Sequence, residues 1–482
     1  MNGFISAADL QSTLAPFIVG AVALVVVLLE FLKPGLRRAI GTFVALAGVI
    51  AAGVAAAQTY GPATATFGGA FLTGGFTVIF EEIILVATAF SLLLLAHMET
   101  EERFPGSCAL MMWSATGAML MAGAGNLLVI FLGLELLSLA LYCLCGLAPR
   151  ASSRESALKY LILSSMASGF MLYGMALLFG ATGSVALADI AKPQAVSTLY
   201  ALGAGLFLVG VAFKLSLVPF HEWVPDVFEG APLATTAFMS VVTKAGVIAV
   251  LARFAYAALP AASAPAMLAP LWVVAGLSMV IGNMAALAQT DIKRLLAYSG
   301  IAQVGYIVAA FAGATPLGMR YAIFYLMAYT FMNLGAFAVV ALLSGNNEEG
   351  SRLASFAGLG QRRPLLAAAM TLFLLSLAGL PPTAGFIGKI LILTTMTSAH
   401  FVWLAALLLA GTAISLYAYF KIIRVMYAPS RVSVMAAAYT VRGGVLPWIT
   451  VGICLAGVLI MGFYPKTPSD VLPTVAAASV IK

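Results

Sequence analysis

Apolar segments long enough to cross a lipid bilayer follow one another along almost the whole chain. A helix needs roughly 20 apolar residues to span the hydrocarbon core, and about fourteen windows of that kind can be traced by hydropathy. They lie near residues 14–32, 40–57, 76–96, 108–124, 127–146, 160–179, 200–218, 233–256, 267–288, 295–313, 321–343, 364–393, 401–426 and 446–463. Only 9% of the 482 residues are charged and 63% are hydrophobic, which is too little charge to cover a soluble protein. We therefore predict an all-α integral membrane protein with about fourteen transmembrane helices.

Basic residues predict the orientation of the chain, because Lys and Arg are retained in cytoplasmic loops. Most of them fall on alternate connections between the windows, and the few on the other side are Lys192, Arg253, Arg320, Lys466 and Lys482. This asymmetry predicts an N-terminus outside the cell, and the first window lacks the pattern of a cleavable signal peptide. The formal charge of +7 is then a signal of membrane topology and does not indicate binding to nucleic acid.

Among the ionisable side chains inside the apolar windows, four are candidates for a functional role: Glu135, Lys214, Lys244 and Lys389. Inserting a charge at the centre of a membrane helix costs roughly 2.5 to 3.5 kcal/mol, so such residues usually belong to an ion or proton path. A structural role stays open for each of them, for example an ion pair that locks two helices. The four together favour a proton relay.

Prolines interrupt two of the windows that carry lysines. Pro219 follows Lys214 by five residues, and Pro381 and Pro382 precede Lys389. Proline removes a backbone donor and breaks the helical hydrogen bonds, although a simple kink is an equally common role for proline in a membrane helix. The two broken helices are the seventh and the twelfth, so a duplicated unit of five helices would place its second copy upside down. Inverted repeats with broken helices are typical of transporters.

This duplication divides the chain into four parts. We expect an N-terminal three-helix segment (1–107), a first repeat of helices four to eight (108–256), a second, inverted repeat of helices nine to thirteen (257–427), and a C-terminal helix with a tail (428–482).

Further titratable residues lie near the ends of the windows. A cluster follows the seventh window: His221, Glu222, Asp226 and Glu229. Within it, His221 and Glu222 are candidates for proton uptake from the cytoplasm, and capping of the loop is an equally good explanation. Glu81 and Glu82 fall in the first turns of the third window, where we expect them at the outer interface or against a partner subunit, with no catalytic role.

No redox cofactor or metal site is expected in this chain. The four cysteines do not form the CxxC spacing typical of zinc or iron–sulfur sites, and only three histidines are present. No glycine-rich turn follows a strand, as a dinucleotide site would require. Any redox chemistry must therefore take place in another chain.

Several motifs resemble a known family. The segment KLSLVPFHEWVPDVFEGAP (214–232), followed by TKAG (243–246), resembles the antiporter-like subunits of respiratory complex I, a superfamily that also includes multisubunit cation/proton antiporters and membrane-bound hydrogenases. Three further segments are similar to the N-subunit branch of bacterial NADH:quinone oxidoreductase: KYLILSSMASGFMLYGMALLFGATGS, DIKRLLAYSGIAQVGYI and LAGLPPTAGFIGK. M subunits usually have a glutamate at the position of Lys389, so this lysine argues against an M subunit. The resemblance runs from about Cys108 to Tyr427.

The resemblance implies a fold and a function. It implies fourteen helices with two inverted five-helix repeats, in which Glu135 and Lys214 form a coupled pair, Lys244 is the central lysine and Lys389 the terminal one. It also implies proton translocation in the bacterial inner membrane, with a periplasmic N-terminus, as a subunit of NADH:quinone oxidoreductase. NADH, FMN, iron–sulfur clusters and quinone, with ubiquinone expected, would lie in the holo-complex. The implied partners are the M, K and J membrane subunits and the hydrophilic arm.

Two alternatives stay open. The first is a subunit of a multisubunit sodium/proton antiporter, which would use the same lysines without electron transfer. The second is an inert scaffold that holds pumps together, in which the four buried charges would tolerate apolar replacement.

Overall fold

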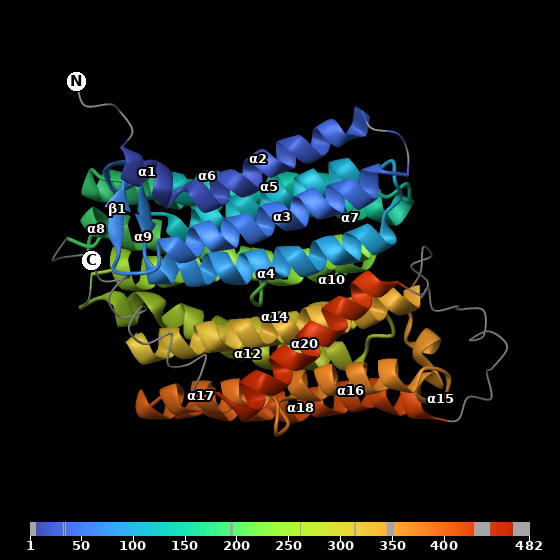
Figure 1. Cartoon of the computed structure of the whole chain (residues 1–482). Coiled ribbons are helices and arrows are strands. Elements are labelled where there is room, and N and C mark those ends of the chain that lie inside the picture. Colours follow the sequence, from blue (N-terminus) through green and yellow to red (C-terminus); the bar gives the residue numbers. More distant parts are fainter. Residues whose placement is uncertain are drawn as a thin grey trace.

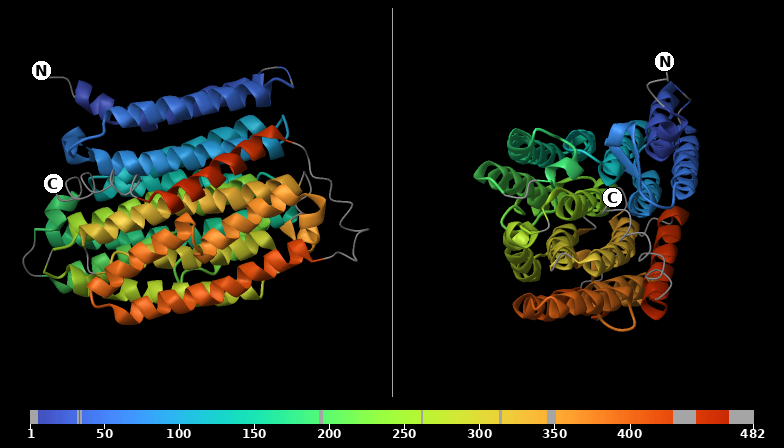
Figure 2. Two further views of the ribbon diagram at one scale, coloured as in Figure 1. Left: turned by 60° about the horizontal axis from the view of Figure 1, so that its bottom comes forward. Right: turned by 90° about the vertical axis from the view of Figure 1, so that its left-hand side faces the viewer.

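The computed structural model describes residues 6–31, 33, 35–192, 196–260, 262–312, 315–344, 351–428 and 444–465 of the chain. Long helices run side by side and form one elongated bundle (Figure 1). The N-terminal helices, in blue, lie on one side of the bundle and the C-terminal helices, in orange, on the opposite side (Figure 2). Helix α20, in red, crosses its neighbours obliquely.

A helix lies within each of the predicted apolar windows. The long helices are α2 (Leu14–Leu28), α3 (Arg37–Gln58), α4 (Gly75–Met98), α5 (Phe104–Gly123), α6 (Leu127–Gly146), α7 (Ala151–Thr182), α9 (Thr198–Lys214), α11 (Leu233–Arg253), α12 (Ala264–Leu287), α13 (Ile292–Ala309), α14 (Pro316–Ser344), α16 (Pro364–Ala378), α17 (Ala384–Ser398), α18 (Val402–Tyr427) and α20 (Val445–Phe463). The short helices and helical turns are α1 (Ala7–Ser12), η1 (Leu29–Phe31), η2 (Phe67–Gly69), α8 (Leu187–Ile190), α10 (Trp223–Gly230), η3 (Phe254–Ala258), η5 (Leu353–Phe356) and α15 (Leu359–Arg362). The twelfth window holds two helices, α16 and α17, so the predicted break is present.

Ten helices of the described residues are long and apolar enough to cross a membrane. Helices α9, α16 and α17 are apolar but shorter than a full span. The predicted all-α membrane fold is therefore confirmed. The number of fourteen crossings and the two inverted repeats stay predictions, and most of the predicted C-terminal tail lies outside the described residues.

Helix α11 lies in the centre of the bundle. Every residue from Leu233 to Arg253 is buried, and α11 packs against α4, α5, α13 and α14. Outer helices instead expose apolar side chains, such as Phe17 on α2 and Tyr173 on α7, as expected of a surface that faces lipid. A polar group on α11 is therefore kept away from both lipid and bulk water.

Glycines allow close helix contacts in both halves of the chain. A methyl group on Gly117 of α5 would lie 2.5 Å from the carbonyl oxygen of Gly133 on α6, and one on Gly282 of α12 would lie 3.0 Å from the carbonyl oxygen of Tyr298 on α13. Small residues let membrane helices approach each other in this way. The pairs α5–α6 and α12–α13 hold corresponding places in the predicted repeats, so the shared contact agrees with a duplication.

One short hairpin departs from the all-helical expectation. Strand β1 (Thr64–Thr66) pairs antiparallel with β2 (Phe71–Thr73) in the connection between α3 and α4. This connection is polar and rich in threonine and glycine, so it has no helical apolar face to bury.

Candidate functional site

Lys389 lies directly at the break between α16 and α17. Its side chain is 4% exposed, and its ammonium donates hydrogen bonds of 3.1 Å to the carbonyl oxygens of Leu377 and Ala378. In an unbroken helix these two carbonyls would accept from the residues four positions later, which are Pro381 and Pro382 and have no N–H. The lysine therefore takes the place of the donors that the prolines remove. This contact gives the predicted pairing of a lysine with a helix break a physical basis.

Lys214 has a different environment, although it also stands at a helix break. Its ammonium donates to the hydroxyls of Ser138 on α6 (2.6 Å) and Ser164 on α7. It also lies 5.9 Å from the ring centroid of Tyr142 and 5.5 Å from that of Tyr160, a distance at which an aromatic ring attracts a cation. Two serines and two tyrosine rings thus hold this cation, and the carbonyls of the break do not.

Helix α9 ends at Lys214, earlier than the predicted end near residue 218. The backbone N–H of Val218 would continue the helix by donating to the Lys214 carbonyl, but it donates to the Ser278 hydroxyl of α12 at 2.9 Å. This side chain competes with the helical hydrogen bond, and Pro219 follows immediately.

Glu135 lies on α6, half-buried, one turn before Ser138. Among the described residues it forms no ion pair with Lys214, although its charge is close enough to act on that lysine through space. One of its carboxylate oxygens is buried and has no hydrogen-bond partner in the described part of the chain. Leu132 and Leu139, near it on α6, are 64% and 56% exposed. The carboxylate is thus placed between the bundle and its outer surface.

Lys244 is buried on the central helix α11, with 2% of its side chain exposed. Its Nζ lies 5.5 Å from the ring centroid of Phe228, and the ammonium has no hydrogen-bond partner within the described ranges. The Lys244 ammonium and the Tyr329 hydroxyl both face Gly300 of α13: a methyl group built there would lie 3.7 Å from the first and 3.0 Å from the second. The absence of a side chain at residue 300 therefore leaves room between them.

Polar side chains that the sequence analysis did not single out connect this region with Lys389. On α13, the Ser299 hydroxyl lies 2.5 Å from the Tyr419 hydroxyl, and the Gln303 amide donates to the Leu377 carbonyl at 3.1 Å. That carbonyl is the one that Lys389 also contacts. The hydroxyl of Tyr325 donates to the amide oxygen of Gln303.

Two further polar groups lie beside Lys244. The amide of Asn333 on α14 donates to Ser240, one turn before Lys244 on α11. The Asn333 carbonyl oxygen and the Tyr329 hydroxyl have no hydrogen-bond partner among the described residues. Polar residues within strongly apolar windows, such as Gln303 and Asn333, were the available sequence signal for this connection.

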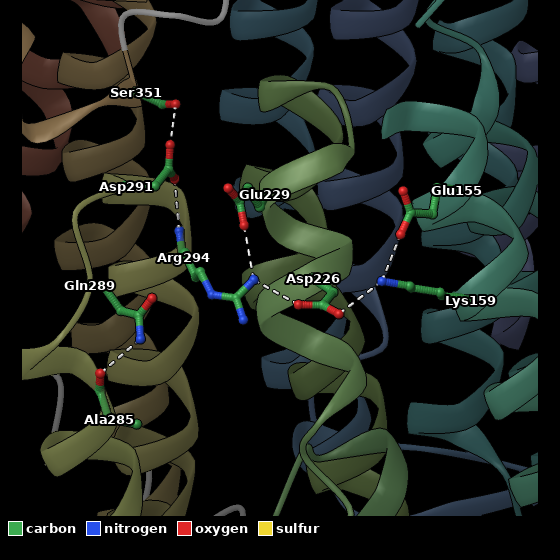
Figure 3. Close-up of polar contacts among 9 residues, drawn as sticks. All are labelled: Glu155, Lys159, Asp226, Glu229, Ala285, Gln289, Asp291, Arg294 and Ser351. Carbon is green, nitrogen blue, oxygen red and sulfur yellow. Dashed lines mark hydrogen bonds and ion pairs between the residues drawn. The ribbon is translucent and has the colours of Figure 1, made fainter. Parts of the chain in front are cut away.

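A cluster of charges joins α7, α10 and α13 (Figure 3). Asp226 of α10 forms ion pairs with Lys159 at 3.0 Å and Arg294 at 2.6 Å. Lys159 also contacts Glu155, and Arg294 also contacts Glu229. Partial burial raises the pKa of the Asp226 carboxyl, but hydrogen bonds from the two cations outweigh this effect and leave that pKa below its usual value.

The predicted cluster after α9 therefore separates into two groups. Asp226 and Glu229 belong to the ion pairs, whereas Glu222 is exposed and His221 is partly buried beside the ring of Tyr298. The buried His221 Nδ1 has no hydrogen-bond partner in the described residues. Proton uptake through His221 and Glu222 stays a prediction.

Three expectations for the ends of helices are wrong. Arg253, expected in an outer loop, is 1% exposed and donates to the Ala122 carbonyl and the Thr77 hydroxyl, each at 2.8 Å. Glu81, expected at an interface, is 2% exposed and interacts electrostatically with Arg253. Lys293, which the sequence places among the basic residues of the cytoplasmic connections, is 1% exposed and donates to the Ala231 carbonyl at 2.8 Å. Hydropathy locates the ends of a window, but it does not show which residues near those ends are buried by neighbouring helices.

Comparison with known proteins assigns the chain to a family. Residues 124–415 match the family described as NADH:quinone oxidoreductase/Mrp antiporter, TM. The NADH-quinone oxidoreductase subunit N of Trichlorobacter lovleyi is 39% identical over 431 residues, which cover 87% of this chain and 88% of that protein. A chain of respiratory complex I from Thermus thermophilus has a TM-score of 0.82 at 33% identity, over 96% of this chain and 100% of that one. A chain of the Mrp complex from Dietzia sp. DQ12-45-1b shares the fold, with a TM-score of 0.84 at 21% identity over 98% of each chain. This chain therefore belongs to the NADH:quinone oxidoreductase/Mrp antiporter family and, within it, to the N subunits of NADH-quinone oxidoreductase.

Proposed function

We propose that Glu135, Lys214, Lys244 and Lys389 are the groups through which this membrane subunit of an NADH:quinone oxidoreductase pumps protons. The observation that carries the proposal is the burial of the three lysines, none of which is more than 4% exposed in a strongly apolar bundle. Ionisable groups in such a place are costly and usually functional.

The contacts of the lysines support a path for protons. The unpartnered polar atoms of Tyr329 and Asn333 lie near Lys244, and buried polar groups of this kind are normally bridged by water. Hydroxyl and amide groups then lead toward Lys389, where Gln303 and the lysine share one carbonyl oxygen. A proton held at Lys244 thus has polar neighbours in the direction of Lys389.

Glu135 is proposed to act as the switch. Its position between the bundle and the exposed leucines of α6 suits a group that senses an adjacent subunit. If a change in that subunit moves the carboxylate from about 8 to about 4 Å from Lys214, the Coulomb attraction rises by roughly 2 kcal/mol at an effective dielectric constant near 20. Lys214 would hold its proton while the pair is close and pass it toward Lys244 when the pair separates.

In such a complex the redox chemistry belongs to other subunits. We propose that NADH, FMN and iron–sulfur clusters are bound by the hydrophilic arm, that quinone, with ubiquinone as our choice, is reduced outside this chain, and that the antiporter-like M subunit and the small K and J subunits are its membrane neighbours. The chain would lie in the bacterial inner membrane with a periplasmic N-terminus.

The sodium/proton antiporter alternative has weaker support. The Mrp chain is 21% identical to this one, which shows a common fold alone. The N subunit of Trichlorobacter lovleyi is 39% identical. Purification of the tagged chain in mild detergent separates the two functions, since only an NADH:quinone oxidoreductase brings NADH-oxidising activity with flavin and iron–sulfur absorbance.

The relay is tested by Lys244→Ala in the intact complex, with NADH-driven proton uptake by inside-out vesicles as the readout. Loss of a positioned proton carrier should lower uptake by at least about a hundredfold. Lys421→Ala is the control for the removal of a lysine, because the Lys421 ammonium donates to the backbone carbonyls of Leu287 and Gln289, at 3.0 and 3.2 Å, and lies outside the proposed path. Equal losses in both variants would indicate a merely structural Lys244.

A further inference from the structure

An apolar cavity lies between α3, α4 and α14, away from the lysines. Its volume is about 570 Å³. The lining residues are Ala57, Tyr60, Val78, Ile79, Glu82, Ile83, Val86, Met327, Thr330 and Phe331. Glu82 is the one charged side chain among them, and the Thr330 hydroxyl already donates to the Leu326 carbonyl at 2.9 Å. The cavity thus combines an apolar body with one carboxylate.

The Glu82 carboxylate lies against α3 rather than against a cation. A methyl group on Gly53 of α3 would be 3.3 Å from one carboxylate oxygen of Glu82 and 3.5 Å from the other. No ion pair or hydrogen bond to Glu82 is present in the described residues. The missing side chain at residue 53 makes the room that the carboxylate occupies.

Arg253 does not neutralise Glu82. The arginine interacts with the neighbouring Glu81, and its donors are directed to Thr77 and Ala122. Glu81 is buried on the protein side of α4, whereas Glu82 is half-buried and faces the cavity. Among the described residues, Arg253 therefore interacts with Glu81 and not with Glu82, whose charge lies in the cavity.

We infer that this cavity binds a phospholipid whose headgroup carries a primary amine, such as phosphatidylethanolamine. The occupant is a lipid because the neighbouring face of α3 is apolar and exposed, with Ile50 at 67% and Val54 at 57% exposure. One acyl chain would fill the apolar lining, and the ammonium would donate hydrogen bonds to Glu82, supplying the positive charge that the described residues do not place there. Glu82 lies about 10 Å from the start of α4, in the part of the helix nearest one membrane face.

Lipid retention by the intact complex tests the inference. The complex is stripped of loosely bound lipid, incubated with mixed micelles of equal parts phosphatidylethanolamine, phosphatidylcholine and phosphatidylglycerol, washed, and its retained lipids are counted by mass spectrometry. Glu82→Gln should lower retained phosphatidylethanolamine at this site by about fivefold, the effect of one charge near a membrane surface. Glu30→Gln, on an exposed glutamate near the end of α2, should leave the lipid profile unchanged.

A second variant tests the volume of the cavity without changing its charge. Ala57 is exposed at the cavity wall, so Ala57→Phe fills space without a clash in the core, and it should lower the retention of this lipid as Glu82→Gln does. Equal retention of the amine lipid by wild type and Glu82→Gln would overturn the inference. The inference would also be overturned if the wild-type complex retained phosphatidylcholine, whose headgroup has no N–H donor, as well as it retains phosphatidylethanolamine. A cysteine introduced by Ala57→Cys that cross-links to another subunit would likewise overturn it, because a protein would then cover the cavity.

Discussion

Gly379 lies against the side chain of Lys389. A methyl group on Gly379 would be 2.8 Å from Cδ of the lysine and 3.4 Å from its Nζ. Gly379 also ends α16 in the left-handed conformation, with a φ of 81°, which favours glycine. The residue that terminates the helix thus also makes room for the amine that contacts the last carbonyls of the same helix.

Gly379→Ala should therefore affect both stability and pumping. The left-handed backbone costs alanine about 1 kcal/mol, and the added methyl group must displace Lys389 from the Leu377 and Ala378 carbonyls. We expect NADH-driven proton uptake to fall severalfold more than the amount of assembled complex. The control is Gly183→Ala, where φ is 73° but no atom lies within 4 Å of the added methyl group. Equal effects of the two variants on pumping would contradict a role for the contact with Lys389.

The two serines that hold Lys214 give a second prediction. A hydrogen bond to a charged group contributes about 1.5 to 3 kcal/mol, so the double change Ser138→Ala and Ser164→Ala should release the ammonium and lower proton uptake in vesicles. Each single change should lower it less, because one hydroxyl and both tyrosine rings remain. Ser415→Ala is the control, since within the described ranges that buried hydroxyl donates only to the Thr412 carbonyl of its own helix. Wild-type uptake in the double variant would show that the hydroxyls do not position Lys214.

The sequence predicts the helices well and their contacts poorly. Each apolar window contains a helix because, in lipid, the backbone must satisfy its own hydrogen bonds whatever the neighbours are. The break at Pro381 and Pro382 follows from proline chemistry alone. The side from which a helix is covered depends on packing, which is why the burial of Arg253, Glu81 and Lys293 was missed.

For the candidate site, too, the sequence predicts some features and misses others. The three lysines are recognisable because a charge in an apolar window is rare. Their hydrogen-bond partners cannot be recognised in this way. Lys214 donates to Ser138 on α6 and Ser164 on α7, and the helix break beside Lys214 supplies none of the hydrogen bonds of this lysine. Such partners become known only when the helices are placed side by side.

Replacing Lys389 by arginine separates charge from proton exchange. The guanidinium keeps the positive charge and can contact the two carbonyls of the break, but it does not release a proton under ordinary conditions. Lys389→Arg should thus preserve assembly and lower NADH-driven proton uptake by at least about tenfold. Lys421→Arg, which also replaces an amine bound to backbone carbonyls, should leave uptake near the wild-type value. Full pumping by Lys389→Arg would rule out proton exchange at this residue.

Glu135→Gln tests the switch. Glutamine keeps the shape of the side chain and loses its charge, so the electrostatic link to Lys214 disappears while α6 packs as before. We expect lower proton uptake at an unchanged content of assembled complex, with Glu30→Gln as the control for a neutralised, exposed glutamate. Unchanged pumping would show that the charge of Glu135 does not control Lys214.

The ion pairs of Asp226 predict a defined pH dependence of stability. The pKa of this carboxyl is lowered in the folded protein, so its stabilising effect is fully present above its usual pKa of about 4 and is lost as the pH falls through the lowered value. Asp226→Asn should destabilise the complex by less than about 1 kcal/mol, because the pairs are partly exposed to solvent, and the effect should shrink with added salt. The difference in the midpoint of thermal inactivation between wild type and variant should stay constant from about pH 8 to about pH 5. A difference that changes within that range would mean that another group, and not the Asp226 carboxyl, controls the contact between α7, α10 and α13.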